Sequence, residues 1–185
     1  MIEHVLVGLA LLLGLAGGYL LARSRWRTGR RGDEAVRRIL LPFTGTVISR
    51  RALDAALRLA QAENATLMPA YLALVPMRLP LECAIPNEAA LAMPILETIE
   101  QRATAQGVPV DARIERGRSY RHALARLLES ESFDRVVVPA RAKGEEGLAG
   151  EDLVWLLESA PAEVLILRPA PSDEIEAALP APAAS

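Results

Sequence analysis

The chain has 185 residues, is 51% apolar and 4% aromatic, and carries one cysteine and two histidines, which leaves room for one ordinary domain and excludes an internal disulfide framework. No spacing of cysteine and histidine is typical of a zinc site, so we expect no metal. The formal net charge is −2, but residues 1–31 hold five arginines and one glutamate, so the rest of the chain carries −6. Nucleic-acid binding needs a basic face, so we expect no nucleic-acid partner.

The chain opens with 18 consecutive uncharged residues, from Val5 to Ala22. As a helix rising about 1.5 Å per residue, this run would extend roughly 27 Å, close to the hydrocarbon thickness of a bilayer. The arginines between Arg23 and Arg31 follow it directly, mark the cytoplasmic side and can attract anionic lipid headgroups. A cleaved signal peptide, the alternative, would carry its basic residues before the apolar run. The pattern predicts a transmembrane anchor over residues 1–22, a basic juxtamembrane linker over 23–36, and a single-pass membrane protein whose domain faces the cytoplasm.

From residue 37 onward, short apolar runs alternate with apolar residues at helical spacing. The short runs predict five strands, which start near residues 39, 66, 108, 133 and 163. Between them we predict four helices, two of which Ser49 and Ser119 are placed to cap. We therefore expect one α/β domain over residues 37–170. The Pro/Ala-rich segment 171–185 has few large apolar residues and is predicted to be a disordered tail.

Strands that alternate with helices predict a doubly wound, five-stranded parallel sheet with helices on both faces and the strand order 3-2-1-4-5. In such a sheet, a ligand binds at the carboxyl ends of the strands where the strand order reverses. That position lies between the loop after the first strand, residues 43–46, and the loop after the fourth strand, residues 139–150. The pattern predicts a crevice there.

Two segments of the domain resemble the universal stress protein (UspA-like) family. The segment ILLPFTGT, from Ile39 to Thr46, is similar to the family's opening I-L-V-P-x-D-G-S, and Ser49 to Leu53 is similar to its R-A-L helix start. The segment from Ser159 to Pro169 resembles the family's ending, H-A-P-C-P-V-L-V-V-R-P. The resemblance covers about residues 37–170. It implies an HUP/UspA-like fold, a nucleotide such as ATP in the crevice, and a homodimer through the last strand, where Val164 to Leu167 forms an apolar edge.

The resemblance also places the nucleotide site on particular positions of this sequence, where several residues depart from the family pattern. Nucleotide-binding members carry G-x-x-G, nine residues, and then G-S or G-T. Here Pro139 and Ala142 stand at the first two glycines, Glu151 stands at the hydroxyl position, and Thr44 replaces the aspartate of the first turn. Carboxylates at a helix N-terminus oppose phosphate binding. The candidate cofactor-binding residues are Phe43, Thr44, Gly45, Thr46, Pro139, Ala140, Arg141 and Gly150. We expect a degenerate site with no bound cofactor, and ATP remains the alternative.

A second group of cationic and titratable residues, RGRSYRH, occupies residues 116–122 at the start of a predicted helix. Backbone donors together with arginines would suit an anion there. The interpretation we favour is a solvated face whose charges pair locally with Asp111 and Glu115.

The sequence does not assemble a nucleophile, a base and an oxyanion site, so we expect no catalytic residues and no enzyme. We predict a membrane-anchored, non-enzymatic stress-response or regulatory binding module that forms a homodimer and acts on a protein partner the sequence does not name. Two alternatives stay open. One is an ATP- or nucleotide-binding switch of the UspA type, and the other is an accessory regulatory domain of a membrane transporter.

Overall fold

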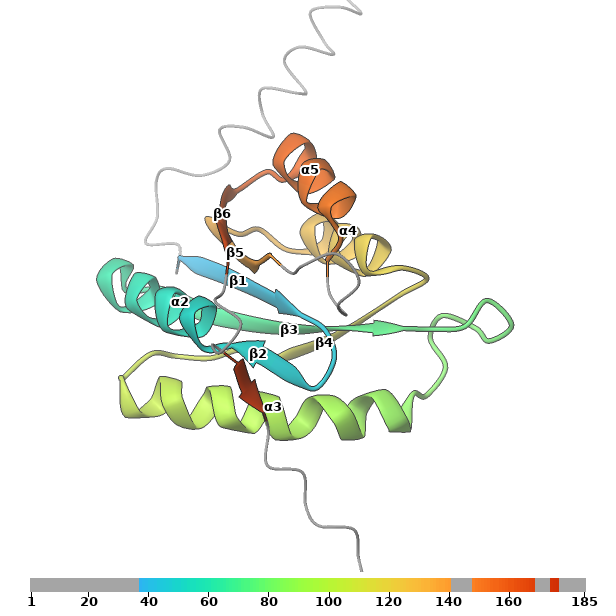
Figure 1. The fold of residues 1–185 in the computed structure, drawn as a ribbon, viewed down its shortest axis with the longest axis horizontal. Coiled ribbons are helices and arrows are strands. Elements are labelled where there is room, and N and C mark those ends of the chain that lie inside the picture. The colour runs from blue at the N-terminus through green and yellow to red at the C-terminus, as the bar shows by residue number, and fades with distance from the viewer. Residues whose placement is uncertain (1–36, 141–147, 169–173, 177–185) are drawn as a thin grey trace, which may run out of the picture. The chain divides into compact units, whose positions relative to one another are not determined.

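The computed structural model describes residues 37–140, 148–168 and 174–176 (Figure 1). The chain divides into two compact units, Met1–Ala35 and Val36–Ser185, and every described residue belongs to the second unit. The predicted anchor over residues 1–22 and the predicted linker over 23–36 lie outside the described residues.

Five strands of the second unit form one parallel sheet in the order β4-β3-β1-β5-β6. Its strands are β1 (Arg38–Phe43), β3 (Thr66–Leu74), β4 (Arg113–Gly117), β5 (Arg135–Pro139) and β6 (Glu163–Leu167). The predicted five-stranded parallel sheet is confirmed. Written in chain numbering, the order differs from 3-2-1-4-5, because the short strand β2 (Val47–Ser49) follows β1 in the chain without joining this sheet.

Four described helices connect the strands: α2 (Arg50–Glu63), α3 (Pro86–Ala105), α4 (Tyr120–Ser130) and α5 (Gly150–Ser159). Both predicted serine caps are present. The Ala52 N–H donates to Ser49 Oγ over 3.2 Å, and the His122 N–H donates to Ser119 Oγ over 3.1 Å. Each cap satisfies a backbone donor that has no partner within its helix, so the two helices begin where these serines lie.

The two faces of the sheet bury separate apolar clusters, because successive side chains of a strand point to opposite faces. Along β1, Ile39 and Leu41 pack into a cluster with residues of α2 and α3, whereas Leu40 packs into a second cluster with residues of α4 and α5. Figure 1 shows α2 and α3 on one side of the sheet and α4 and α5 on the other. All three β1 side chains are fully buried, and each such burial stabilises the fold by about 1.5–3 kcal/mol. The fold is doubly wound around β1.

Part of the segment 171–185, which was predicted to be a disordered tail, is described and is ordered differently from that prediction. Residues Glu174–Glu176 form a short strand, β7, which pairs antiparallel with β2 in a second, two-stranded sheet. Ser49 lies opposite Glu174, and Val47 lies opposite Glu176. The composition of the tail does not predict this strand, because its backbone hydrogen bonds come from the edge of β2, a distant part of the chain.

The predicted localisation as a single-pass membrane protein needs correction. Among the described residues, no helix combines the length and the apolar character that crossing a bilayer requires. The 20-residue helix α3 is long enough, but it carries Glu88, Glu97, Glu100 and Arg102, which are costly in hydrocarbon. This finding overturns the membrane localisation, and the uncharged run that suggested it lies outside the described residues. The expected lipid contact through the anchor and Arg23–Arg31 is likewise without support.

Candidate functional site

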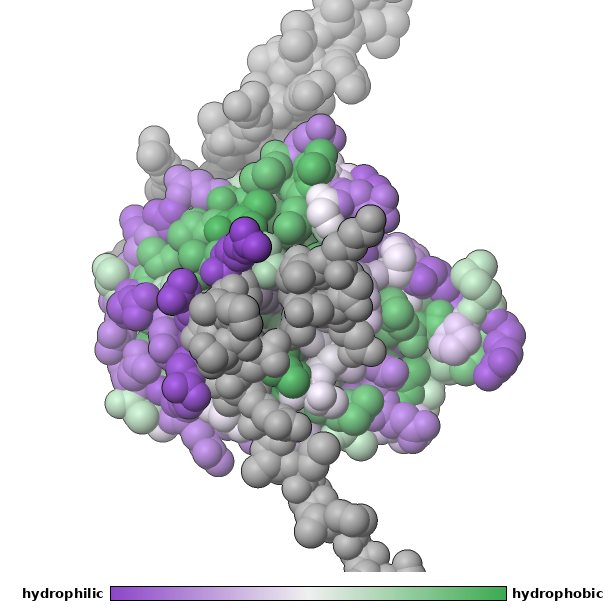
Figure 2. Space-filling model, viewed as in Figure 1, coloured by the Kyte–Doolittle hydropathy of each residue, from purple (hydrophilic) through white to green (hydrophobic). Residues whose placement is uncertain are grey.

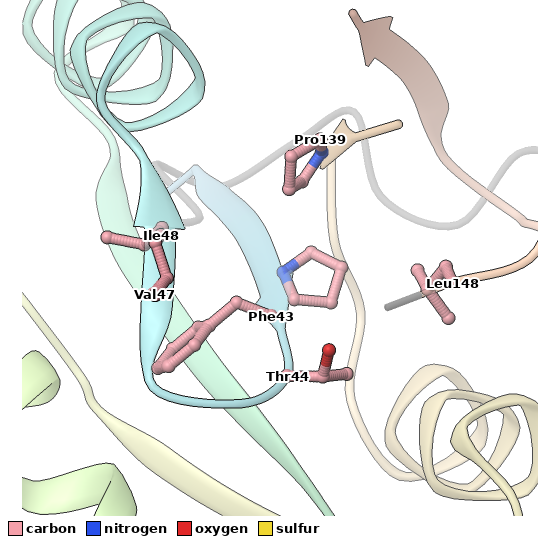
Figure 3. A pocket seen from close by; sticks show the side chains of 7 residues that line it. Phe43, Thr44, Val47, Ile48, Pro139 and Leu148 are labelled. Carbon is pink, nitrogen blue, oxygen red and sulfur yellow. The ribbon is translucent and has the colours of Figure 1, made fainter. Parts of the chain in front are cut away.

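A small pocket lies at the carboxyl ends of β1 and β5 (Figure 3). These two strands are neighbours in the sheet. After β1 the sheet grows on one side of β1 with β3 and β4, and the later strands β5 and β6 lie on the other side of β1. The strand order therefore reverses at this point, where doubly wound folds bind their ligands. The pocket encloses about 10 Å³, which is close to the space that one water molecule needs. Its lining residues are Pro42, Phe43, Thr44, Val47, Ile48, Pro139 and Leu148.

The turn after β1 shapes one wall of the pocket. Gly45 lies in this turn with φ at 68°. This left-handed backbone conformation is unfavourable for residues that carry a Cβ atom. The turn brings the chain back as β2, so that Val47 and Ile48 face the pocket, as Figure 3 shows. Phe43 supports this wall from β1, since its ring meets the Tyr71 ring edge-on at 5.6 Å between centroids.

Among the described residues that line the pocket, Thr44 alone carries a side-chain hydroxyl. The residue is 4% exposed, and its Oγ1 has no hydrogen-bond partner among the described residues. In Figure 3 this oxygen points into the space near Phe43, Pro139 and Leu148. A buried polar atom without a partner costs about 1–3 kcal/mol. In the described part of the chain, the backbone N–H groups of Gly45 and Thr46 have no acceptor, but neither residue lines the pocket.

The opposite wall, at the end of β5, offers fewer donors. Pro139 has no N–H, and the Ala140 N–H donates to the Leu167 carbonyl oxygen over 2.7 Å. At the start of α5, the Ala149 N–H donates to the Asp152 carboxylate over 3.1 Å, and Glu151 adds a second carboxylate to the first turn. The helix therefore satisfies its own N-terminus with negative charge, which opposes a phosphate at that position.

The structure brings most of the predicted site residues together. Phe43, Thr44 and Pro139 line the pocket, Gly45 and Thr46 form its turn, and Ala140 follows Pro139 directly. Gly150 does not line the pocket, because it is the exposed first residue of α5. Arg141 lies outside the described residues. The experimental question for these residues is which ligand they contact.

Four lining residues were missed by the sequence prediction: Pro42, Val47, Ile48 and Leu148. Two features of the sequence could have identified three of these four residues. Val47 and Ile48 are β-branched and follow a glycine turn, which favours a strand. Leu148 is the only large apolar residue between Arg141 and Asp152 and is buried.

The arginines of residues 116–122 and their neighbours make local contacts. Arg118 donates to the carbonyl oxygens of Val75, Pro76 and Leu79 over 2.5–3.1 Å. Arg126 lies 3.6 Å from Glu115 and 3.4 Å from Glu82. These contacts hold the loop after β3 against β4 and α4. The partners differ from the expected ones, because Glu115 pairs with Arg126 and Asp111 pairs with Arg113, whereas Arg116 lies 3.8 Å from Glu82.

Comparisons with known proteins agree on the fold. UspA from Lactobacillus plantarum is 17% identical, with a TM-score of 0.57, over 74% of this chain and all (100%) of its own. A universal stress protein solved in complex with cAMP is 22% identical, with a TM-score of 0.52, over 74% of this chain and 100% of its own. The Archaeoglobus fulgidus universal stress protein in complex with dAMP is 11% identical, with a TM-score of 0.54, over 72% of this chain and 98% of its own.

Among curated proteins, no sequence matches the chain significantly. The family comparison is decisive, because the Universal stress protein family matches residues 35–168, well over half of the chain. The expected family resemblance is thereby confirmed for the domain. The chain belongs to the universal stress protein family.

Proposed function

We propose that this domain is a non-enzymatic regulatory module that binds a small molecule of the adenine-nucleotide class at the carboxyl ends of β1 and β5. The observation that carries the proposal is the buried hydroxyl of Thr44, which has no partner among the described residues and points into the pocket. Proteins with a similar fold have been solved with cAMP and with dAMP, and this supports the choice of ligand class.

A binding role fits the chemistry of the lining better than catalysis does. Thr44 is the one lining residue with a side-chain oxygen, and no carboxylate, imidazole or amine joins it among the described residues that line the pocket. A hydroxyl without a neighbouring base is a weak nucleophile at neutral pH. We therefore assign the stress-response role to ligand binding, which would regulate a protein partner.

The test is isothermal titration of AMP, cAMP and ATP with magnesium into the full-length protein. We expect saturable binding of at least one of them. Gly45→Val should weaken it at least tenfold, because valine at a φ of 68° must move the turn. Gly150→Ala is the matched control, since a Cβ at Gly150 meets no atom within 4 Å. Circular dichroism must show both variants folded. Absence of binding at millimolar concentrations of all three ligands would contradict the proposal.

We further propose that the domain forms a homodimer through β6. This strand lies at one end of the sheet, and its Ile166 is 37% exposed. Figure 2 shows apolar residues gathered where Figure 1 places β6 and α5, and Val154 and Leu157 of α5 are exposed as well. An exposed apolar edge strand is commonly covered by another chain.

Sedimentation velocity of the full-length protein tests the dimer. Ile166→Glu should shift the protein to a monomer, whereas Met93→Glu, which changes an exposed apolar residue of α3, should leave the dimer intact. A monomeric unmodified protein at micromolar concentration would rule the dimer out.

A further inference from the structure

We propose that the strand β7 couples the ligand site to the segment that follows the sheet, because its pairing with β2 holds the turn between β1 and β2. Ligand binding and this pairing then stabilise each other. The proposal rests on the function proposed above and adds its regulation. Three features of the described residues carry it: the residues that the pocket and β7 share, the way in which β2 is held, and the position of Thr44.

The short strand β2 forms a wall of the pocket and also pairs with β7. Its residues Val47 and Ile48 line the pocket, and Figure 3 shows both of them on the strand that follows the turn. In the second sheet, Val47 lies opposite Glu176, and Ile48 lies opposite Ile175. Figure 1 shows β7, in dark red, beside β2. The residues of β2 that line the ligand site are therefore also residues that β7 pairs with through the backbone.

One end of β2 is anchored without β7. Its last residue, Ser49, caps α2 by accepting from the Ala52 N–H over 3.2 Å. Ile48 is 1% exposed and belongs to the apolar cluster with residues of α2 and α3, whereas Val47 is only partly buried. In the described part of the chain, β7 is the strand partner of β2, which does not join the five-stranded sheet. The effect of β7 therefore falls on Val47 and on the turn before it.

This turn carries Thr44, the residue proposed to contact the ligand. Thr44, Gly45 and Thr46 lie between the end of β1 and the start of β2. The five-stranded sheet fixes the β1 side of the turn, and the pairing with β7 fixes the Val47 side. Without β7, the turn gains conformational freedom, which a ligand must remove when it binds. Because ordering a segment on binding costs affinity, a turn that is already fixed binds more tightly.

The coupling works in both directions. Two binding events that favour one conformation of a shared segment strengthen each other by the same factor. A ligand that orders the turn should therefore also stabilise the pairing of β7 with β2. The state of β7 then depends on whether the ligand is bound, which supplies the output that a regulatory module needs.

The experiment removes the pairing in the full-length protein by the double substitution Ile175→Pro and Glu176→Pro. Neighbouring residues of a strand direct their N–H groups to opposite sides, so one of the two prolines removes a donor that faces β2. The matched control, Ile175→Val with Glu176→Gln, removes the same charge and keeps both N–H groups. Because β7 is not part of the five-stranded sheet, circular dichroism should show both variants folded.

Hydrogen exchange without ligand is the first measurement. We expect the β2 amides that pair with β7 to exchange about tenfold faster in the proline variant than in the control. In the unmodified protein, saturating ligand should slow the exchange of the β7 amides.

Isothermal titration is the second measurement, with whichever of AMP, cAMP and ATP binds the unmodified protein most tightly. The proline variant should bind this ligand about fivefold more weakly, as expected for a site whose binding conformation is populated about one fifth of the time. The control variant should bind it as the unmodified protein does.

The outcomes distinguish this inference from the proposed function. Unchanged exchange of β2 in the proline variant would show that β7 does not hold the turn and would overturn the inference. Unchanged or tighter ligand binding by that variant, or no protection of β7 by ligand, would overturn the coupling and leave the proposed function standing. Failure of all three compounds to bind the unmodified protein at millimolar concentration would contradict the proposed function and, with it, the coupling.

Discussion

The central sheet has an amino edge, formed by the amino ends of its strands, and a carboxyl edge, formed by their carboxyl ends. The polar groups at these two edges differ in whether they have partners. At the amino ends of β1, β5 and β6, charges from different elements pair with one another. Arg135 Nε lies 2.7 Å from Glu63 Oε1, the Arg38 N–H donates to Asp134 over 2.9 Å, and Arg38 also forms an ion pair with Glu131. At the carboxyl ends, Thr44 Oγ1 has no partner among the described residues, and the nearby lining is apolar.

We propose that this difference separates stability from ligand binding. Folded proteins satisfy nearly all of their buried polar groups, so an unsatisfied one needs an explanation. The amino edge satisfies its groups within the chain and joins α2, β1, β5 and β6. At the carboxyl end of β1, Thr44 Oγ1 has no partner among the described residues, and we propose that a ligand supplies one. The carboxyl ends of β3 and β4 also carry stabilising contacts, since Arg118 donates to the carbonyl oxygens of Val75, Pro76 and Leu79.

The largest expected effect comes from Gly117, and it tests whether the carboxyl edge tolerates change throughout. A Cβ on this buried residue at the end of β4 would lie 2.4 Å from the Ala123 backbone nitrogen. It would also lie 2.6 Å from the Ser119 backbone oxygen. Because both neighbouring atoms belong to packed backbone, Gly117→Ala should lower the free energy of unfolding by about 3 kcal/mol, as overpacking does. Urea unfolding measures this. Gly150→Ala has open space and should change stability by less than about 0.5 kcal/mol. Equal losses in both variants would refute the steric explanation.

A smaller effect is expected at the amino edge, where Glu63 is the central acceptor. Its side chain is 14% exposed and pairs with Arg135 and Arg37. Glu63→Gln should lower the free energy of unfolding by about 1 kcal/mol, because the pairs are partly screened by solvent. Glu129→Gln, an exposed position on α4, is the control and should be neutral within about 0.3 kcal/mol. Ligand affinity should stay the same in both, and a parallel loss of affinity in Glu63→Gln would break the separation of the two edges.

The smallest stability change is expected at Thr44, with the opposite sign. Thr44→Val replaces a buried hydroxyl that has no partner among the described residues with a methyl group, so the free energy of unfolding should rise by about 0.5–1 kcal/mol while ligand binding weakens. Thermal and urea unfolding without ligand measure the change. A loss of more than about 1 kcal/mol would mean that a bound water molecule already forms the hydrogen bond with this hydroxyl. The hydroxyl would then not be available to a ligand.

Much of the fold could be predicted because its signals are local. The apolar run from Ile39 to Leu41 predicts a buried strand. Ser49 and Ser119 predict the starts of the helices that they cap. Part of the site followed from the same reasoning, since a parallel sheet brings Thr44 and Pro139 to one edge wherever β1 and β5 are neighbours. The approach of Leu148 to this edge could not be predicted, because it depends on contacts between residues that are distant in the sequence.

The sequence by itself determined the alternation of strands and helices, the caps and the glycine turn, since each depends on residues within a few positions of one another. Only the tertiary structure decided which polar groups are left without partners. The carboxylate of Asp152 turns back to the Ala149 N–H, the Ala140 N–H goes to Leu167, and β7 pairs with β2. Whether a polar group is hydrogen-bonded depends on where its donor and its acceptor lie relative to each other in the folded chain. For this reason the buried Thr44 hydroxyl, which has no partner among the described residues, becomes visible only after the chain has folded around it.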